Sequence, residues 1–260
     1  MRQRLSVLLL ICIVCNSTVL SFNDSLASLP SCLLACRCDN NSVSCENVDF
    51  EDGISSLLTE QTVTLRLSDG DFVDDVVVPR LFENATSLQE LVLVDYDVEQ
   101  VATPPADTNF TAELPAALRT IELRANDIEH YNTIARLCAW WPGLTQIDLS
   151  DNSIEHTEPG VTVGEFHRIT AALRVLLLRR TELQTLPLIP ESLEQLDVSH
   201  NEIDSIPDRW LRGKLQIIVA SNAIEHIDDD TFTLLSDLRT LELSYNRLAS
   251  PAHWLARLPA

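Results

Sequence analysis

The chain has 260 residues and a formal net charge of −21, from 18 basic and 39 acidic side chains. So acidic a chain repels nucleic acid and polyphosphate, which excludes their binding by general electrostatic attraction. It also holds no G-x-G-x-x-G or G-K-S/T motif, which excludes a glycine-rich phosphate-binding loop. Disorder is excluded too, because 45% of the residues are hydrophobic. Most of this hydrophobic content is aliphatic: 42 residues are leucine, whereas only 5% are aromatic, and 6 residues are glycine.

The amino-terminal segment, residues 1–21, has the pattern of a secretory signal peptide. Two arginines precede the apolar run Leu5–Cys15, and the small side chains Val19 and Ser21 follow it, ahead of a cleavage site. An uncleaved membrane anchor is the alternative, but the run has about eleven residues and a bilayer span needs about twenty. The segment therefore predicts a protein that is secreted or lies on the extracellular surface.

A cysteine-rich segment follows, and we assign it residues 22–50 as an amino-terminal cap. Its spacing is C-x3-C-x-C-x6-C, through Cys32, Cys36, Cys38 and Cys45. In an oxidising compartment this spacing predicts two disulfides, and spacing alone leaves three pairings open. Zinc ligation is the competing interpretation, disfavoured because secreted thiols oxidise and no histidine is near. Cys138 lies in a later apolar stretch and is expected to be a buried, inert thiol, with an intermolecular disulfide as the alternative.

Export also agrees with four acceptor sites for N-linked glycosylation. Each is an N-x-S/T triplet without proline at its centre, at Asn23, Asn40, Asn84 and Asn109.

The rest of the chain repeats the register L-x-x-L-x-L-x-x-N-x-L. Repeats begin at Thr62, Leu88, Leu118, Leu144, Leu173, Leu193, Lys214 and Leu238. The L-x-L alternation puts leucines on one face of a short strand and variable residues on the other, and units of this size bury their leucines only by stacking. Asparagine at the ninth position can satisfy backbone groups of neighbouring turns. Gly70, Tyr96 and Thr181 replace it, and we expect the repeat with Tyr96 to be locally irregular.

With this register and the cysteine cluster, the chain resembles the extracellular leucine-rich-repeat proteins, in which a cysteine-rich cap precedes the repeats. The resemblance implies an α/β solenoid over residues 51–260, about eight repeats in a horseshoe. A parallel sheet would form its concave face, and short helices, 3₁₀ turns or extended segments its convex face. It also implies the disulfides Cys32–Cys38 and Cys36–Cys45.

Repeat length sets what the convex face holds. The longer units leave room for a helix, best placed at Tyr131–Trp141, while Val101–Pro115 is expected to be a surface loop. The shorter units after Leu173 should have extended or 3₁₀ backs, as their prolines suggest.

The carboxy-terminal end has no second cysteine cap. A solenoid without a cap exposes its core edge, so either Pro251–Ala260 folds over that edge or the chain is part of a longer protein.

The concave face is the expected partner surface, with a merely solvated face as the alternative. Leu177 and Ile218 project there among charged residues, like the apolar centre of an interface inside a polar rim. The candidate partner-binding residues are Glu122, Arg124, Asp148, Leu177, Arg179, Asp197, Ile218 and Glu242.

Metal binding and catalysis are not predicted. His130, His156 and His226 end three similar repeat tails, but only the first two are close enough to meet, and repeat ancestry explains the pattern more simply. The acidic clusters lack the calcium-loop glycine and glutamate, so they are interpreted as solvated turns. No G-x-S-x-G or H-E-x-x-H motif is present, and no cofactor is predicted.

The sequence thus predicts a non-enzymatic extracellular module that binds a protein or glycan, including a second copy of itself, and no nucleic acid. The alternatives are the ectodomain of a membrane receptor for adhesion or innate immunity, with a membrane anchor beyond Ala260, and a structural matrix protein.

Overall fold

The computed structural model of the chain describes residues 36–39, 41–48, 57–70, 76–77, 85–101, 115–206, 216–235, 238–249 and 253–258. The predicted signal peptide, the four glycosylation sites and Cys32 lie outside the described residues, as does nearly all of the predicted loop Val101–Pro115.

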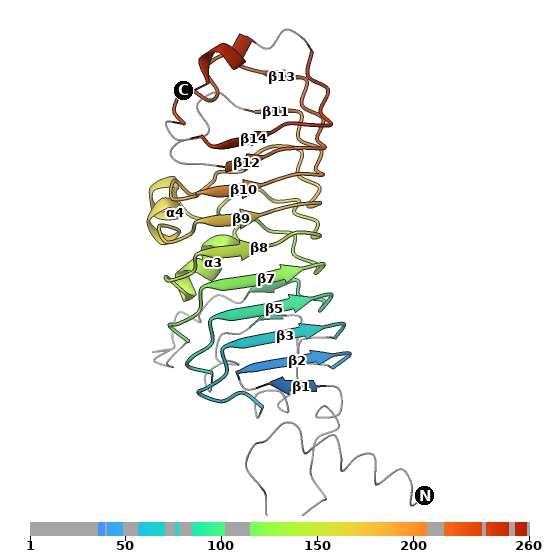
Figure 1. Cartoon of the computed structure of the whole chain (residues 1–260), viewed down its shortest axis with the longest axis vertical. Helices are drawn as coiled ribbons and strands as arrows, with labels where there is room; N and C mark the ends of the chain where they lie inside the picture. The colour runs from blue at the N-terminus through green and yellow to red at the C-terminus, as the bar shows by residue number, and fades with distance from the viewer. Residues whose placement is uncertain are drawn as a thin grey trace, which may run out of the picture.

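The described residues form a sheet of ten strands, with one strand from each predicted repeat (Figure 1). Its strands, in spatial order, are β1 (Cys36–Asp39), β2 (Ser42–Glu46), β3 (Thr64–Ser68), β5 (Glu90–Val94), β7 (Thr120–Arg124), β8 (Gln146–Asp148), β9 (Val175–Leu177), β10 (Gln195–Asp197), β12 (Gln216–Ile218) and β14 (Thr240–Glu242). Among the described strands of this sheet, β1 and β2 pair antiparallel and each later pair of neighbours is parallel. Sequential parallel pairing confirms the predicted solenoid.

The leucine register forms the core because the strand alternation points it inward. In β3, Leu65 and Leu67 are buried at 0% and 1% exposure while Arg66 between them is exposed. The same two positions are buried in every repeat as far as β12, whereas Leu241 and Leu243 of the last repeat are half-buried. One aliphatic stack therefore runs through the coils and opens at the last one.

The predicted asparagines tie each coil to the one before it. Asn152 is representative: its Oδ1 accepts the backbone N–H groups of Asn126 and Ile128, at 3.2 and 3.1 Å. Its Nδ2 donates to the carbonyls of Leu123 and Leu149, at 2.7 and 2.8 Å. Asn126, Asn201, Asn222 and Asn246 likewise bond to the preceding coil. These side chains satisfy buried backbone groups as the chain leaves the strand.

A left-handed residue precedes the ninth position in every repeat. Its φ lies between 50° and 64°, and it is never glycine: Asp69, Asp95, Ala125, Asp151, Arg180, His200, Ser221 and Tyr245. The irregularity expected at Tyr96 is confined to this turn, where Asp97 is also left-handed, with φ 47°. β5 itself keeps an unbroken register with β3 and β7. Glu182, after Thr181, shows the same extra left-handed residue, with φ 60°.

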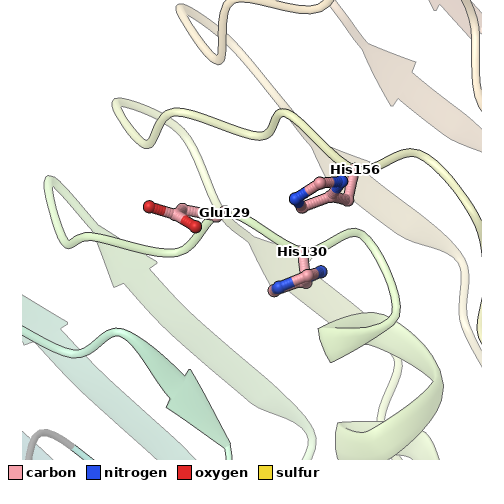
Figure 2. Close-up of side chains that lie close together, drawn as sticks. All are labelled: Glu129, His130 and His156. Atoms are coloured by element: carbon pink, nitrogen blue, oxygen red, sulfur yellow. The ribbon is translucent and has the colours of Figure 1, made fainter.

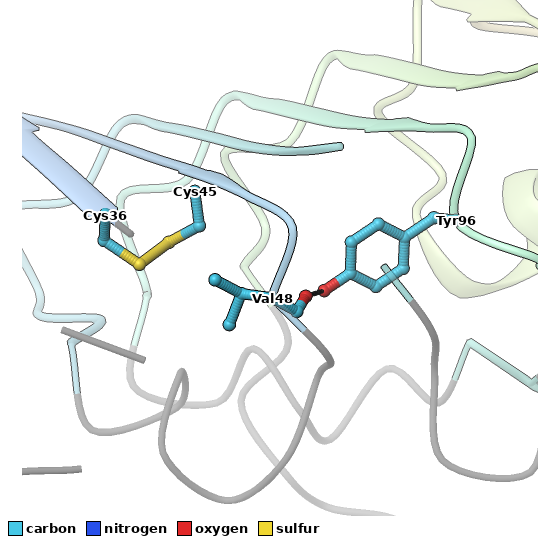
Figure 3. Close-up of a disulfide and its surroundings, with 4 residues drawn as sticks. All are labelled: Cys36, Cys45, Val48 and Tyr96. Carbon is cyan, nitrogen blue, oxygen red and sulfur yellow. Dashed lines mark hydrogen bonds between the residues drawn. A yellow bond between two sulfur atoms is a disulfide. The ribbon is translucent and has the colours of Figure 1, made fainter. Parts of the chain in front are cut away.

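The amino-terminal cap is closed by a disulfide between Cys36 and Cys45, across the β1–β2 hairpin (Figure 3). One of the two expected disulfides is thus confirmed; the other involves Cys32 and stays a prediction.

Two departures from asparagine accommodate this cap. A Cβ on Gly70 would collide with the backbone carbonyl of Val48. The buried hydroxyl of Tyr96 donates a hydrogen bond to that same carbonyl (Figure 3). Gly70 therefore leaves room for the end of the cap, and Tyr96 binds it.

Outside this sheet, the described residues form two α-helices and two pairs of short parallel strands, of which α3, α4, β11 and β13 are labelled in Figure 1. Helix α3 (Thr133–Trp140) confirms the helix predicted at 131–141, and Cys138 on it is buried as expected. Helix α4 (Val163–Ile169) lies in the next coil. The strands β4 (Val76–Val77) and β6 (Gln100–Val101) pair with each other, as do β11 (Ser205–Ile206) and β13 (His226–Ile227), which makes the later backs extended as predicted.

The described carboxy-terminal residues form a 3₁₀ helix, η4 (His253–Arg257), which packs on the last coils. Trp254 is buried at 8% exposure, and its ring meets Phe232 edge-on at 5.5 Å. This contact agrees with a carboxy-terminal segment that folds back on the solenoid; whether the segment covers the core edge or the chain is part of a longer protein stays open, since Leu241 and Leu243 remain half-buried. Through the described ranges, no helix has both the length and the apolar character needed to cross a bilayer.

Candidate functional site

We call the side of the sheet opposite the leucines the open face; the resemblance predicts it as the concave surface. The fifth residue of each repeat aligns with that of the next, so the predicted positions form one continuous row across eight strands. The row runs Arg66, Val92, Glu122, Asp148, Leu177, Asp197, Ile218 and Glu242. Of Ile218 only the backbone is described.

Two aspartates of the row are buried and serve the fold. Asp148 and Asp197 are 3% and 7% exposed. In each, Oδ1 accepts the backbone N–H of the serine two residues on, at 2.9 Å for Ser150 and 3.0 Å for Ser199. These carboxylates are therefore largely removed from solvent, and each caps a backbone amide of its own coil.

The second carboxylate oxygen of each aspartate faces an arginine of the preceding coil. Arg124 Nε lies 3.9 Å from Asp148 Oδ2, and Arg179 Nε lies 3.8 Å from Asp197 Oδ2. Both arginine side chains remain 37% exposed. Both contacts are ion pairs beyond hydrogen-bond distance, so each guanidinium is attracted to a buried carboxylate while part of it faces solvent.

Further ion pairs border this pair of arginines. Arg180 contacts both oxygens of Asp151, at 2.5 and 3.0 Å, and this hydrogen bond lowers the pKa of the Asp151 carboxyl. Arg124 adds a contact to Asp151 at 3.6 Å, and Arg66 pairs with Glu90 at 2.5 Å. The sequence-based candidate set omitted Arg66, Glu90, Asp151 and Arg180. Opposite charges at nearby positions of successive repeats were the signal for them.

Glu122 is the residue of the row whose negative charge is destabilised by its surroundings. Its side chain is half-buried, and its pKa is raised by burial first and by the neighbouring Asp148 second. Glu242, at the far end of the row, is exposed; its carboxylate accepts hydrogen bonds from Ser244, which lower its pKa.

Leu177 lies at the centre of this charged surface. It is half-buried, and its neighbours in the row are Asp148 and Asp197. In the described part of the row, Leu177 thus has a buried aspartate on each side, with Arg179 two residues further along its own coil and Arg124 two coils earlier.

The histidines singled out in the sequence lie away from this row. His130 and His156 come together after β7 and β8, and their rings stack with centroids 4.4 Å apart (Figure 2). His226 lies elsewhere, with Ser205 as its register partner. Glu129 completes a group of three potential ligands, whereas no other such group occurs among the described residues.

Comparison with known proteins places this geometry in a family. The family model described as leucine rich repeat matches residues 191–248. Pig (Sus scrofa) fibromodulin is 32% identical over 149 residues, which are 54% of this chain and 94% of that sequence. The chain belongs to the leucine-rich-repeat family. It is an extracellular protein, in agreement with its relatives and its disulfide.

The similarity extends to other leucine-rich-repeat proteins. Rat (Rattus norvegicus) osteomodulin is 28% identical over 144 residues, and the chain spans 33% of that sequence. Among solved structures, a chain of the octameric complex of Latrophilin 3, Unc5D and FLRT2 (LRR) is 26% identical with a TM-score of 0.59. That match covers 86% of this chain and 65% of the other.

Proposed function

We propose that the chain is a non-enzymatic recognition module that binds an extracellular protein on its open face, centred on Leu177. The observation that carries the proposal is that Arg124 and Arg179 pair with the buried Asp148 and Asp197 and stay 37% exposed, on the face where Leu177 is half-buried. Partly exposed arginines on a face with an apolar side chain are typical of interface hot spots.

The charge of the molecule supports a partner that is neutral or basic overall. At −21 the chain attracts basic proteins over a distance and repels acidic ones. The two arginines would then pair with individual carboxylates of such a partner, which fixes its register. We keep Glu122, Ile218 and Glu242 in the proposed contact set and assign Asp148 and Asp197 a structural role.

The relatives favour protein recognition over catalysis. The solved complex that the chain resembles joins FLRT2 to two other proteins, and another relative is human Toll-like receptor 1, 21% identical over 180 residues. No enzyme family is indicated by these matches.

The proposal is tested by screening the tagged, secreted protein against displayed extracellular domains and a glycan array. For a domain that the wild type binds, Leu177→Ala and Arg179→Gln should each weaken the affinity at least tenfold (about 1.4 kcal/mol). Val163→Ala is the matched control, because Val163 is 57% exposed but lies on α4, away from the open face. Circular dichroism checks that each variant is folded.

Unchanged affinity of Leu177→Ala and Arg179→Gln for every bound domain would overturn the open face as the binding surface. Binding to glycans alone would overturn the protein partner while leaving the surface in place.

A further inference from the structure

Two neighbouring coils end their turns with the same three residues, Ile-Glu-His. They are Ile128–His130 after β7 and Ile154–His156 after β8. His130 and His156 form a parallel bridge between these coils. The backbone N–H of His156 donates to the carbonyl of Glu129 at 3.1 Å, and that of Tyr131 donates to the carbonyl of His156 at 2.8 Å. Both histidines are therefore anchored in register by their backbones.

The side chains at this bridge form a compact group of donors. The imidazole rings of His130 and His156 stack with 4.4 Å between centroids and 17° between planes. One nitrogen of each ring and one carboxylate oxygen of Glu129 all lie within 4.8 Å of one another. Figure 2 shows the rings one above the other with Glu129 beside them. All three side chains are exposed.

We propose that Glu129, His130 and His156 bind a divalent transition-metal ion, with Zn²⁺ as the ion they fit best. Two imidazoles and one carboxylate are a common zinc ligand set, and a water completes four-coordination. Zinc ligands lie about 2.0–2.2 Å from the ion, so tetrahedral neighbours are roughly 3.3 Å apart. Rotation of the exposed side chains closes the remaining gap, while the bridged backbones stay fixed.

Ligand type distinguishes this site from a calcium or magnesium site. Those ions prefer an all-oxygen shell, whereas imidazole nitrogen suits zinc and its neighbours in the transition series. The strongly acidic chain adds a favourable long-range potential for any cation. Among the described residues, neither histidine ring nor the Glu129 carboxylate is engaged in a side-chain hydrogen bond or ion pair that ligation would break.

The chain supplies its own control for this arrangement. His226 ends a third tail of the same sequence, Ile224–His226, but the residue in register with it is Ser205. Its Nε2 instead lies 3.0 Å from Asp228 Oδ1. His226 has the same sequence context but no histidine in register with it. A variant at His226 therefore shows whether metal binding requires two histidines paired across neighbouring coils.

The test is Zn²⁺ titration of the intact, chelator-treated protein by calorimetry, with Ca²⁺ and Mg²⁺ as further arms. The wild type should bind one equivalent of Zn²⁺ through this site, and His130→Asn and His156→Asn should each weaken that binding at least tenfold. His226→Asn should leave it within twofold. Zn²⁺ should also raise the Tm of the wild type and not that of His156→Asn, because only the folded site binds.

Absence of Zn²⁺ binding up to 1 mM, on the order of the weakest extracellular metal sites, would overturn the proposal. So would Zn²⁺ binding that is equal in the wild type, His130→Asn and His156→Asn, since the ion would then lie elsewhere. Tighter binding of Ca²⁺ or Mg²⁺ than of Zn²⁺ would overturn the assignment of the ion.

Discussion

Single polar side chains do much of the work of holding neighbouring coils together. Asn152 is 3% exposed and serves two N–H groups and two carbonyls, spread over its own coil and the preceding one. A buried backbone group without a hydrogen-bond partner costs about 1–3 kcal/mol, so one such asparagine contributes a sizeable part of the free energy of unfolding.

We therefore expect Asn152→Ala to lower the free energy of unfolding by about 3–5 kcal/mol, as measured by urea denaturation. Asn246→Ala is the graded control, because Asn246 is half-buried in the last repeat and its Oδ1 accepts a single N–H, from Ile224. Its expected loss is about 1–2 kcal/mol. Equal losses for the two variants would contradict this account.

Glu122 predicts a pH dependence of opposite sign to that of an ordinary surface carboxylate. Its raised pKa means that the folded chain holds the proton more tightly than the unfolded chain. Its contribution to stability therefore falls as pH rises above the ordinary value of 4.5. Glu122→Gln should stabilise the protein at pH 7, by less than about 1 kcal/mol because the group is half-exposed, and the gain should vanish near pH 4.

Thermal unfolding of Glu122→Gln across this pH range checks the sign. Glu242→Gln is the control, since the pKa of Glu242 is lowered by its hydrogen bonds to Ser244 and that variant should show no gain at pH 7. A gain for Glu122→Gln that persists at pH 4 would point to a cause other than the ionisation of Glu122.

At the scale of elements, the β2–β3 pairing joins the cap to the solenoid, and the carbonyl of Val48 adds a second contact between them. The carbonyl of Val48 occupies the space that a side chain at Gly70 would need, and it accepts the hydroxyl of Tyr96. Tyr96→Phe should cost about 1–2 kcal/mol by leaving this carbonyl without that donor. Gly70→Ala should cost about 1–3 kcal/mol by overpacking.

Limited proteolysis and urea denaturation report on this joint. Gly164→Ala is the matched control, because its new Cβ would meet nothing within 4 Å and it lies in helix α4. That change should be neutral or stabilise the helix by up to about 1 kcal/mol. If Gly70→Ala were as harmless as Gly164→Ala, the joint would not have the tight packing described.

The elements that the sequence predicted are those with a periodic signal. Eight strands followed from the leucine register, and α3 followed from a long unit with an apolar stretch. Helix α4 was missed because Phe166 is its only buried residue, too little to make a recognisable apolar face. Gly70 and Tyr96 looked like losses of asparagine, because their roles exist only once the cap has folded beside them.

The sequence predicted which residues share the open face, but it did not predict how exposed their side chains are. Repeat position alone placed Asp148, Leu177 and Asp197 on one face. Position does not reveal burial, however. Both aspartates lie on the nominally solvent-facing side, yet backbone amides and overlying arginines cover them.

At the scale of the whole molecule, the 3₁₀ helix η4 contributes to stability by packing on an earlier coil. Trp254 is buried against Phe232, which is itself buried. We expect Trp254→Ala to cost about 3 kcal/mol and to promote association through the apolar surface that it exposes. Denaturation together with light scattering at several protein concentrations measures both effects.

Leu255→Ala is the control for this end of the molecule, because Leu255 lies in the same 3₁₀ helix and is 55% exposed. It should change neither stability nor association appreciably. If Trp254→Ala behaved like Leu255→Ala, the packing on Phe232 would not be what stabilises this end.

The left-handed residue of every coil has a consequence for how this protein can change. Glycine or asparagine would adopt that backbone most easily, yet five of the eight positions carry Ala125, Arg180, His200, Ser221 and Tyr245. Each such residue costs roughly 1–2 kcal/mol relative to glycine. These turns thus carry side chains at backbone positions where conformation alone would favour glycine. The side chains of these turns can therefore be replaced by glycine or asparagine without backbone strain, because either residue adopts the left-handed conformation more easily than the residue now present.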